Sequence, residues 1–241
     1  MRLPTLKSAD MSIKTVLWDV DATLLQHILP ERIAIGKCFE DFGFGKCTDE
    51  MLDAYPAINR KWWDRLQSGE KTLHELTVGR FEEFLGMFNL DVSKAVLFND
   101  AYMKRLGDTV CFVPDAQKVL AELKRRGIRQ YIVTNGMVVA QKNKIEKSGI
   151  SSFVDGVFIS EEVGYDKPDV RFFEYVFSRA NLTDRSEIMI AGDSLSTDMQ
   201  GGHNAGIVCC WFNENHNEAK VPFKIDYEIT DLVEVLDIVK E

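Results

Sequence analysis

The sequence lacks several features that would place it in other classes of protein. No stretch comes near the roughly 18 consecutive apolar residues that a membrane span needs. Positively charged residues are outnumbered, because the 29 Lys and Arg against 38 Asp and Glu give a formal net charge of −9. An acidic surface repels a phosphate polymer, although one small phosphorylated ligand is compatible with a local cation in a cleft. We therefore expect neither a membrane nor a nucleic acid polymer as a partner.

Cysteine pairs of the C-x-x-C kind are also missing, and the number of cysteines is odd. The five are Cys38, Cys47, Cys111, Cys209 and Cys210. Unpaired thiols are typical of a reducing compartment, so we expect reduced cysteines and a cytoplasmic protein. Residues Met1 to Ser12 lack the apolar segment of a signal peptide, and we expect a short extension before the first strand.

What is present is an ordinary globular composition. The 241 residues are 45% hydrophobic and 28% charged, enough to bury a full core. No internal repeat or low-complexity segment is visible. The length suits one α/β domain, or a core domain with a smaller insertion, in a monomer or a small homo-oligomer.

Two regions of different character follow one another along the chain. A short apolar run, Thr15 to Trp18, predicts a buried strand. From about Leu25 to Met103 the amphipathic patterns predict four or five helices. Within this block, Trp62 and Trp63 are interpreted as core residues, at most one of them lining a pocket. Arg80 could either reach a substrate or form a surface salt bridge.

After Pro114 the patterns of helix and strand alternate. Helices are predicted over 116–126, 138–148, 169–180 and 198–205, and strands over 130–133, 157–160, 188–191, 207–211 and 227–229. Such alternation predicts a parallel sheet with helices on both faces. The fold class is therefore α/β, a Rossmann-like doubly wound parallel sheet with an inserted α-helical block.

Polar side chains follow three of these strands. Asp19 and Asp21 come after the first strand, Thr134 ends the second, and Asp193 follows a later one. Ligands of an open parallel sheet bind beyond the carboxyl ends of its strands, so these residues should converge. Asp198 and Lys167 lie in neighbouring segments of the same half.

This set of residues suits phosphate chemistry. Carboxylates that share a cleft raise each other's pKa unless a cation balances them, and oxygen ligands suit Mg²⁺. A lysine and a hydroxyl can bind phosphate oxygens, and a carboxylate can attack phosphorus. Each residue alone has a simpler interpretation: Asp21 could cap a turn, Lys167 could be a solvated loop lysine, and Asp198 could stabilise a helix N-terminus.

Together the segments resemble the haloacid dehalogenase superfamily. Asp19-Val20-Asp21-Ala22-Thr23 is similar to its DxDx[TV] motif, Thr134 and Lys167 resemble its second and third motifs, and Gly192-Asp193 with Asp198 resembles the fourth. Many relatives carry Gly where this chain has Ala22, and we expect activity to survive that difference. Because Asp21 is a second carboxylate, phosphate chemistry is favoured over carbon–halogen cleavage.

The resemblance implies a role for each residue. Asp19 would be the nucleophile and a metal ligand, and Asp21 the general acid/base, with its backbone carbonyl on the metal. Thr134, the Asn135 amide and Lys167 would hold the phosphate, with Lys167 also steadying the nucleophile. Asp193 would bind Mg²⁺ directly, and Asp198 would act at the metal through water or a hydrogen bond. The implied domains are a core, 1–24 and 107–241, and a helical cap, 25–106, that closes over the substrate.

Longer segments resemble the YjjG/YfnB-type branch of that superfamily. They are Gly79–Glu82, Ser160–Gly164, Gly201–Gly206 with Asn204, and Cys210–Asn213. The resemblance implies a 5′-nucleotidase for nucleoside monophosphates, with pyrimidine forms favoured. Sugar-phosphate or phosphoglycolate phosphatases, a phosphomutase, and a non-catalytic phosphate-binding or regulatory protein on the same scaffold remain as alternatives.

Overall fold

The computed structural model describes residues 12–240 and divides them into two compact units. The sheet unit contains the chain up to Gln26, Cys111–Val138, and the chain from Ser148 onward. The helical unit contains His27–Val110 and Val139–Lys147. The expected N-terminal extension lies outside the described residues, apart from Ser12.

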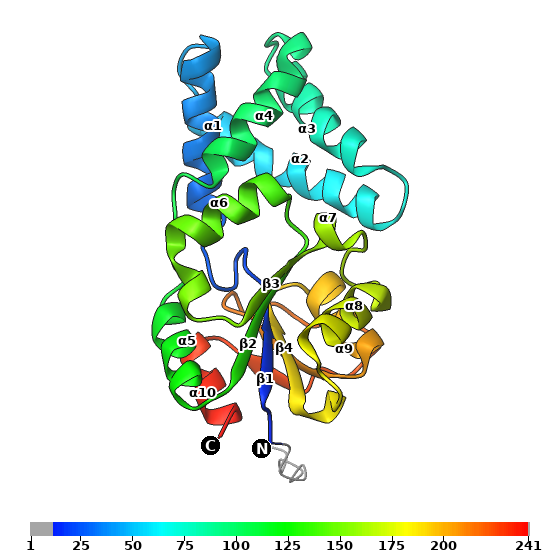
Figure 1. The fold of residues 1–241 in the computed structure, drawn as a ribbon. Coiled ribbons are helices and arrows are strands. Elements are labelled where there is room, and N and C mark those ends of the chain that lie inside the picture. The colour runs from blue at the N-terminus through cyan, green and yellow to red at the C-terminus, as the bar shows by residue number, and fades with distance from the viewer. Residues whose placement is uncertain (1–11, 241) are drawn as a thin grey trace. The chain divides into compact units, whose positions relative to one another are not determined.

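The sheet unit is built on one parallel sheet of six strands, which confirms the predicted fold class (Figure 1). Its strand order is β3-β2-β1-β4-β5-β6. The strands are β1 (Thr15–Trp18), β2 (Arg129–Thr134), β3 (Gly156–Ile159), β4 (Ile188–Gly192), β5 (Val208–Phe212) and β6 (Tyr227–Ile229). Four residues of β1 and all five of β4 and of β5 are buried, as expected of strands covered on both faces.

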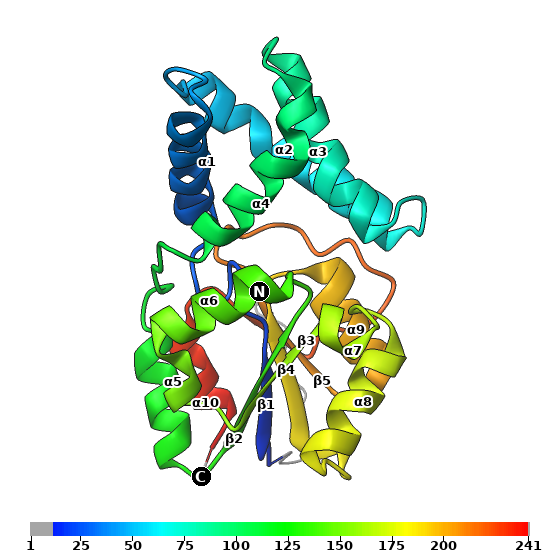
Figure 2. The same cartoon turned by 45° about the horizontal axis from the view of Figure 1, so that its top comes forward.

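Helices cover both faces of this sheet. Figures 1 and 2 show α5 (Ala116–Arg125) and α10 (Val235–Ile238) on one side, and α8 (Val170–Ala180) and α9 (Gln200–Ala205) on the other. The short α7 (Ser160–Val163) follows β3, and α6 (Val138–Ser148) crosses the division between the units. One apolar cluster joins α8 to β4 and β5 through Phe172, Phe173, Val176, Ile190 and Trp211.

The strand order creates a switch point beside β1. The strands that follow β1 in the sequence, β2 and β3, lie on one side of it, and the later strands β4, β5 and β6 lie on the other side. Loops that leave β1 and β4 at their carboxyl ends therefore turn away from each other and leave room for a ligand. Asp19 and Asp193 are the first residues after these two strands.

Residues His27–Val110 of the helical unit form four long helices and a short 3₁₀ turn, Val92–Lys94, in agreement with the four or five helices expected there. The helices are α1 (Ile28–Phe42), α2 (Asp49–Gln67), α3 (Leu73–Met87) and α4 (Ala95–Leu106). Thr48 caps α2, and Thr72 with Glu75 forms a reciprocal capping box at the start of α3. Buried aromatic rings fill the core between the helices, with Tyr55 stacked on Phe81 at 5.3 Å between ring centroids.

Arg80 lies in this core, so the interpretation as a surface salt bridge is wrong. Its side chain is almost fully buried on α3. The guanidinium donates to Asn59 at 3.0 Å and to Asn99 at 2.8 Å, and it lies over the ring of Phe81. Buried charge requires such partners, and neutral amides supply them here.

Trp62 and Trp63 are both half-buried on α2. Trp62 packs against Gly79 on α3 and donates its indole N–H to Glu83 at 3.0 Å, so it contacts the neighbouring helix without belonging to the fully buried core.

No described helix is both long and apolar enough to span a membrane. All five cysteines are free thiols, with Cys38, Cys209 and Cys210 buried.

Candidate active site

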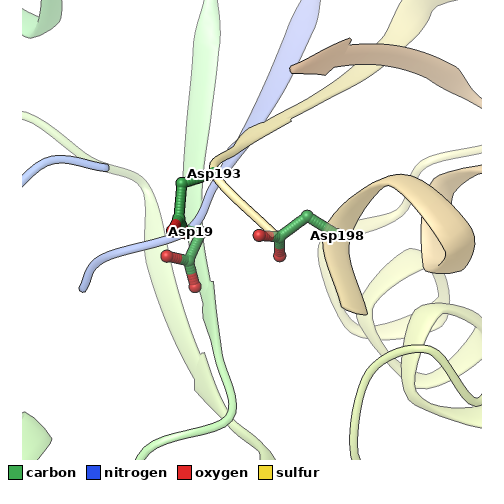
Figure 3. A group of neighbouring side chains, drawn as sticks. All are labelled: Asp19, Asp193 and Asp198. Carbon is green, nitrogen blue, oxygen red and sulfur yellow. The ribbon is translucent and has the colours of Figure 1, made fainter. Parts of the chain in front are cut away.

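Two carboxylates meet at the switch point because β1 and β4 are direct neighbours. Trp18 pairs with Ala191 in the last step of their ladder. The N–H of Asp19 donates to the carbonyl of Ala191 at 3.0 Å and carries the pairing one residue further. Figure 3 shows the side chains of Asp19, Asp193 and Asp198, which come from three separate segments and turn toward a common point. One carboxylate oxygen from each lies within 4.8 Å of the others.

Lys167 joins two of these carboxylates. Its Nζ donates to Asp19 Oδ1 at 2.8 Å, to Asp198 Oδ1 at 2.6 Å and to the carbonyl of Val133 at 2.8 Å. An ammonium group has three N–H donors, so these bonds use all of them. Lys167 and Asp198 are 1% exposed, which makes this a buried ion pair and not a solvated loop lysine.

Two asparagines hold the loop that carries Lys167. Asn135 makes a reciprocal pair of bonds: its Nδ2 donates to the Lys167 carbonyl at 2.7 Å, and its Oδ1 accepts from the Lys167 N–H at 2.8 Å. Asn204 donates to the carbonyl of Pro168 at 3.0 Å. Thr134, at the end of β2, is buried and its Oγ1 accepts from the N–H of Gly136. The end of β2 is thereby tied to Lys167.

Asp21 lies in a tight turn after β1. The carbonyl of Val20 accepts the N–H groups of Leu24 and Leu25 at 2.9 Å, and Asp21 pairs with Leu25 in an isolated bridge. Asp21 is partly exposed, and its charge contributes to the raised pKa of Asp19. The turn therefore places a second, more solvated carboxylate beside the buried one.

Asp198 does not begin a helix, contrary to the prediction of a helix over 198–205. It lies inside a π-helical turn, Leu195–Met199, and α9 begins only at Gln200. Its Oδ2 accepts from the N–H of Ser194 at 3.1 Å. A Cβ on Gly192 would lie 2.3 Å from this oxygen, so the absence of a side chain there lets Asp198 reach Lys167.

The carboxylates of the cluster outnumber the positive charge bonded to them, and loss of water together with this excess of negative charge shifts their pKa values. The pKa of Asp19 is raised to about 7: burial raises it most, Lys167 lowers it, and the carboxylates of Asp198 and Asp21 raise it further. The pKa of Asp193 is raised to about 8 by partial loss of water around it and by the charges of Asp19 and Asp198. Burial alone would lower the pKa of Lys167, but its two carboxylate partners outweigh this and hold the pKa above its usual value.

The donor set fits a hard divalent cation. Asp19, Asp193 and Asp198 bring three negative charges, and within residues 12–240 Lys167 is the cation bonded to Asp19 and Asp198. The ionised group thus has a formal charge of −2, which one Mg²⁺ would balance. Carboxylate oxygens with access to water are the ligands that Mg²⁺ prefers, and Asp193 is exposed.

The structure brings the residues singled out from the sequence to one edge of the sheet. It also reveals three contacts that the sequence did not assign. Thr23 accepts a hydrogen bond from the backbone of Asp193, Trp211 donates one to it, and Ser194 bonds Asp198. Thr23 and Trp211 belong to segments that carried the family resemblance, but nothing in a single sequence shows which backbone atom a side chain will meet.

This sheet order, with a lysine and carboxylates at its switch point, defines a class of α/β proteins with an acidic site suited to a cation and a phosphate. A profile of haloacid dehalogenase-like hydrolases matches residues 13–206. The chain belongs to this family of hydrolases.

Known relatives agree with this assignment. The chain is 30% identical over 203 residues to the pyrimidine 5′-nucleotidase YjjG of Escherichia coli, covering 84% of this chain and 87% of that one. It is 30% identical over 233 residues to the pyrimidine 5′-nucleotidase PynA of Streptococcus pneumoniae, covering 94% and 96%. The crystal structure of the HAD-hydrolase YfnB of Bacillus subtilis, bound to magnesium, has a TM-score of 0.89 at 30% identity and covers 95% and 99%.

Proposed function

We propose that the protein is a Mg²⁺-dependent phosphatase that hydrolyses small phosphomonoesters through an aspartyl-phosphate on Asp19. Within that class we propose a 5′-nucleotidase that acts on nucleoside monophosphates, pyrimidine nucleotides among them. The observation that carries the proposal is the buried bridge from Lys167 to Asp19 and Asp198, with Asp193 beside it at the switch point.

Asp19 is suited to attack phosphorus. Lys167 fixes one of its oxygens, which orients the carboxylate. Without a further cation its pKa of about 7 would leave much of it protonated at neutral pH. Bound Mg²⁺ would supply positive charge that keeps the carboxylates ionised and offsets the charge of the phosphoryl group. Asp19, the Asp21 carbonyl, Asp193 and, through water or a hydrogen bond, Asp198 would hold it.

Asp21 is suited to move protons in both halves of the reaction. As an Asp19 oxygen bonds to phosphorus, the bond from phosphorus to the leaving oxygen breaks, and Asp21 donates a proton to that oxygen. Asp21 then takes a proton from water as the water oxygen attacks phosphorus, and the bond to Asp19 breaks. Its partial exposure gives it access to that water.

The phosphoryl oxygens would meet donors at the end of β2. The Thr134 hydroxyl and the Asn135 backbone N–H lie at and directly after the end of β2, and the Asn135 side chain ties this segment to the Lys167 backbone. The three donors of the Lys167 ammonium are already used, so Lys167 would hold the phosphate as a positive charge or by exchanging one of those bonds. These groups recognise phosphate and carry no information about the rest of the substrate. We propose that His27–Val110, the part of the helical unit inserted between Gln26 and Cys111, acts as the cap that selects the rest of the substrate.

The substrate class rests on the relatives. YjjG and PynA are named as pyrimidine 5′-nucleotidases and are similar over most of this chain. The free cysteines fit a reducing compartment, and we propose a cytoplasmic enzyme that is a monomer or a small homo-oligomer.

The test is phosphate release from a panel of nucleoside monophosphates, sugar phosphates and phosphoglycolate, measured with Mg²⁺ and again with chelator. We expect chelator-sensitive release, concentrated on nucleotides. Release concentrated on sugar phosphates or phosphoglycolate would keep the mechanism and overturn the substrate class. Release from none of them, together with Mg²⁺-dependent phosphate binding, would favour a non-catalytic binding protein.

A further inference from the structure

Asp193 lies just beyond the part of β4 that the sheet holds. The last ladder pair between β4 and β5 is Gly192 with Trp211. Asp193 follows Gly192, is exposed and lies outside β4, and no ladder pair of the described strands includes it. A ligand carboxylate attached to a loose backbone would lose entropy each time it bound a metal.

Two side chains hold this backbone instead. The Asp193 N–H donates to Thr23 Oγ1 at 3.1 Å, and the Asp193 carbonyl accepts from Trp211 Nε1 at 2.8 Å. Thr23 is fully buried and Trp211 is 2% exposed. The two bonds lie on either side of the Asp193 Cα, so together they fix the direction in which its carboxylate projects. Both bonds are partly shielded from water, which makes them stronger than fully exposed ones.

We propose that Trp211 is a positioning residue for Asp193 and that its indole N–H sets the affinity of the site for Mg²⁺. The proposal rests on the metal site described under the proposed function. Trp211 already belongs to the strand that pairs with Gly192, and its side chain supplies a hydrogen bond one residue beyond the end of the ladder. Its ring packs in the apolar cluster with Met199 and Ile190, which holds the N–H in place.

A purely structural role would need only the ring. The chain contains a matched comparison in Trp18, a fully buried tryptophan at the end of β1. Its Nε1 donates to Gln130 Oε1 at 3.1 Å, a bond that holds no metal-site residue. Trp18→Phe and Trp211→Phe remove the same donor and the same ring area, but only Trp211→Phe removes one of the two hydrogen bonds that hold the Asp193 backbone.

The experiment measures Mg²⁺ binding to the whole protein by calorimetry, without substrate. We expect Trp211→Phe to raise the Mg²⁺ dissociation constant about tenfold or more, as removal of outer partners of metal ligands does. Trp18→Phe should leave the dissociation constant close to that of the wild type. Equal dissociation constants for Trp211→Phe and the wild type would overturn the proposal.

A second variant separates the N–H from the packing of the ring. Replacement of Trp211 by β-(3-benzothienyl)alanine puts sulfur in place of the N–H and keeps the two-ring shape. The proposal predicts that this variant loses Mg²⁺ affinity as Trp211→Phe does, and retention of wild-type affinity would overturn it. If the wild type itself binds no Mg²⁺, the metal site in the proposed function is wrong. If the wild type binds Mg²⁺ and Trp211→Phe binds it equally well, only the positioning role of Trp211 is wrong.

Discussion

The backbone of Ala22 has a positive φ of 65° in the turn after β1. An alanine in this left-handed region is strained by about 1–2 kcal/mol, whereas glycine adopts it freely. Ala22 is exposed, so its methyl group gains little from packing. We therefore expect the difference from relatives that carry glycine here to affect stability and not the reaction proposed for Asp19 and Asp21.

We predict that Ala22→Gly raises the free energy of unfolding by roughly 0.5–1 kcal/mol, because the relief of strain exceeds the added entropy of the unfolded chain. Phosphatase activity should stay near the wild-type level. The matched control is Ala121→Gly, at an exposed position in α5, which should lose about 1 kcal/mol. A urea titration of both variants measures the two free energies of unfolding, and a loss of stability in Ala22→Gly would contradict the strain argument.

Among the elements, the contact between α2 and α3 depends on one close approach. A Cβ on Gly79 would lie 2.1 Å from the ring of Trp62. The same ring is fixed by its hydrogen bond to Glu83 and by Arg65, whose guanidinium lies 4.9 Å from its centre. Since the ring cannot shift without breaking these contacts, the position requires glycine.

We predict that Gly79→Ala lowers the free energy of unfolding by about 1–3 kcal/mol through overpacking. Gly86 lies on the same helix, where a new Cβ would meet only an ordinary contact at 3.6 Å. Gly86→Ala should therefore be neutral or stabilise by up to about 1 kcal/mol. If the two variants unfold alike in urea, the close packing of Trp62 on Gly79 is wrong.

Local patterns predicted most of these elements. Val138–Ser148 and Tyr227–Ile229 were predicted with the observed bounds, and the β1 run was predicted whole, because apolar periodicity and glycine stops act locally. The π-helical turn Leu195–Met199 was missed because its five residues give no periodic signal of their own, and the bond that Asp198 makes from it to Lys167 is distant in the sequence. The short α10 was also missed, since a four-residue helix gives almost no periodic signal.

The candidate site was predicted through its motifs, and the structure adds the reasons for their geometry. A sequence can place Asp19 and Asp193 after neighbouring strands, but it cannot show that Lys167 uses all its donors or that Trp211 meets the Asp193 carbonyl. Arg80 was misjudged for a similar reason. The amides of Asn59 and Asn99 that make its burial tolerable come from two other helices.

At the scale of the whole molecule, stability should depend on pH and Mg²⁺ together. Without metal, the pKa values of Asp19 and Asp193 are about 7 and about 8, against an ordinary value of 3.8. Between these limits the native protein binds more protons than the unfolded chain, so its stability falls as pH rises. Bound Mg²⁺ would hold the carboxylates ionised and remove that loss.

We therefore predict that Mg²⁺ raises the melting temperature more at pH 8 than at pH 5. At a concentration 100 times its dissociation constant, the gain would be about 2.7 kcal/mol. The measurement is a set of melting curves with Mg²⁺ and with chelator at both pH values. The buffers contain no Ca²⁺ and have the same ionic strength, so that the screening of charges is equal in all of them. A Mg²⁺ effect that is equal at the two pH values, or larger at pH 5, would contradict the assignment of these carboxylates to the metal.

The central claim is that Asp19 attacks phosphorus, and the most direct test is the turnover of Asp19→Asn with Mg²⁺ and the best substrate of the panel. We predict that this variant folds and loses nearly all activity, while Asp237→Asn, at an exposed position on α10, keeps the wild-type rate. If Asp19→Asn kept more than about a tenth of the rate, less than ~1.4 kcal/mol of the barrier would depend on this carboxylate. Asp19 would then not be the nucleophile.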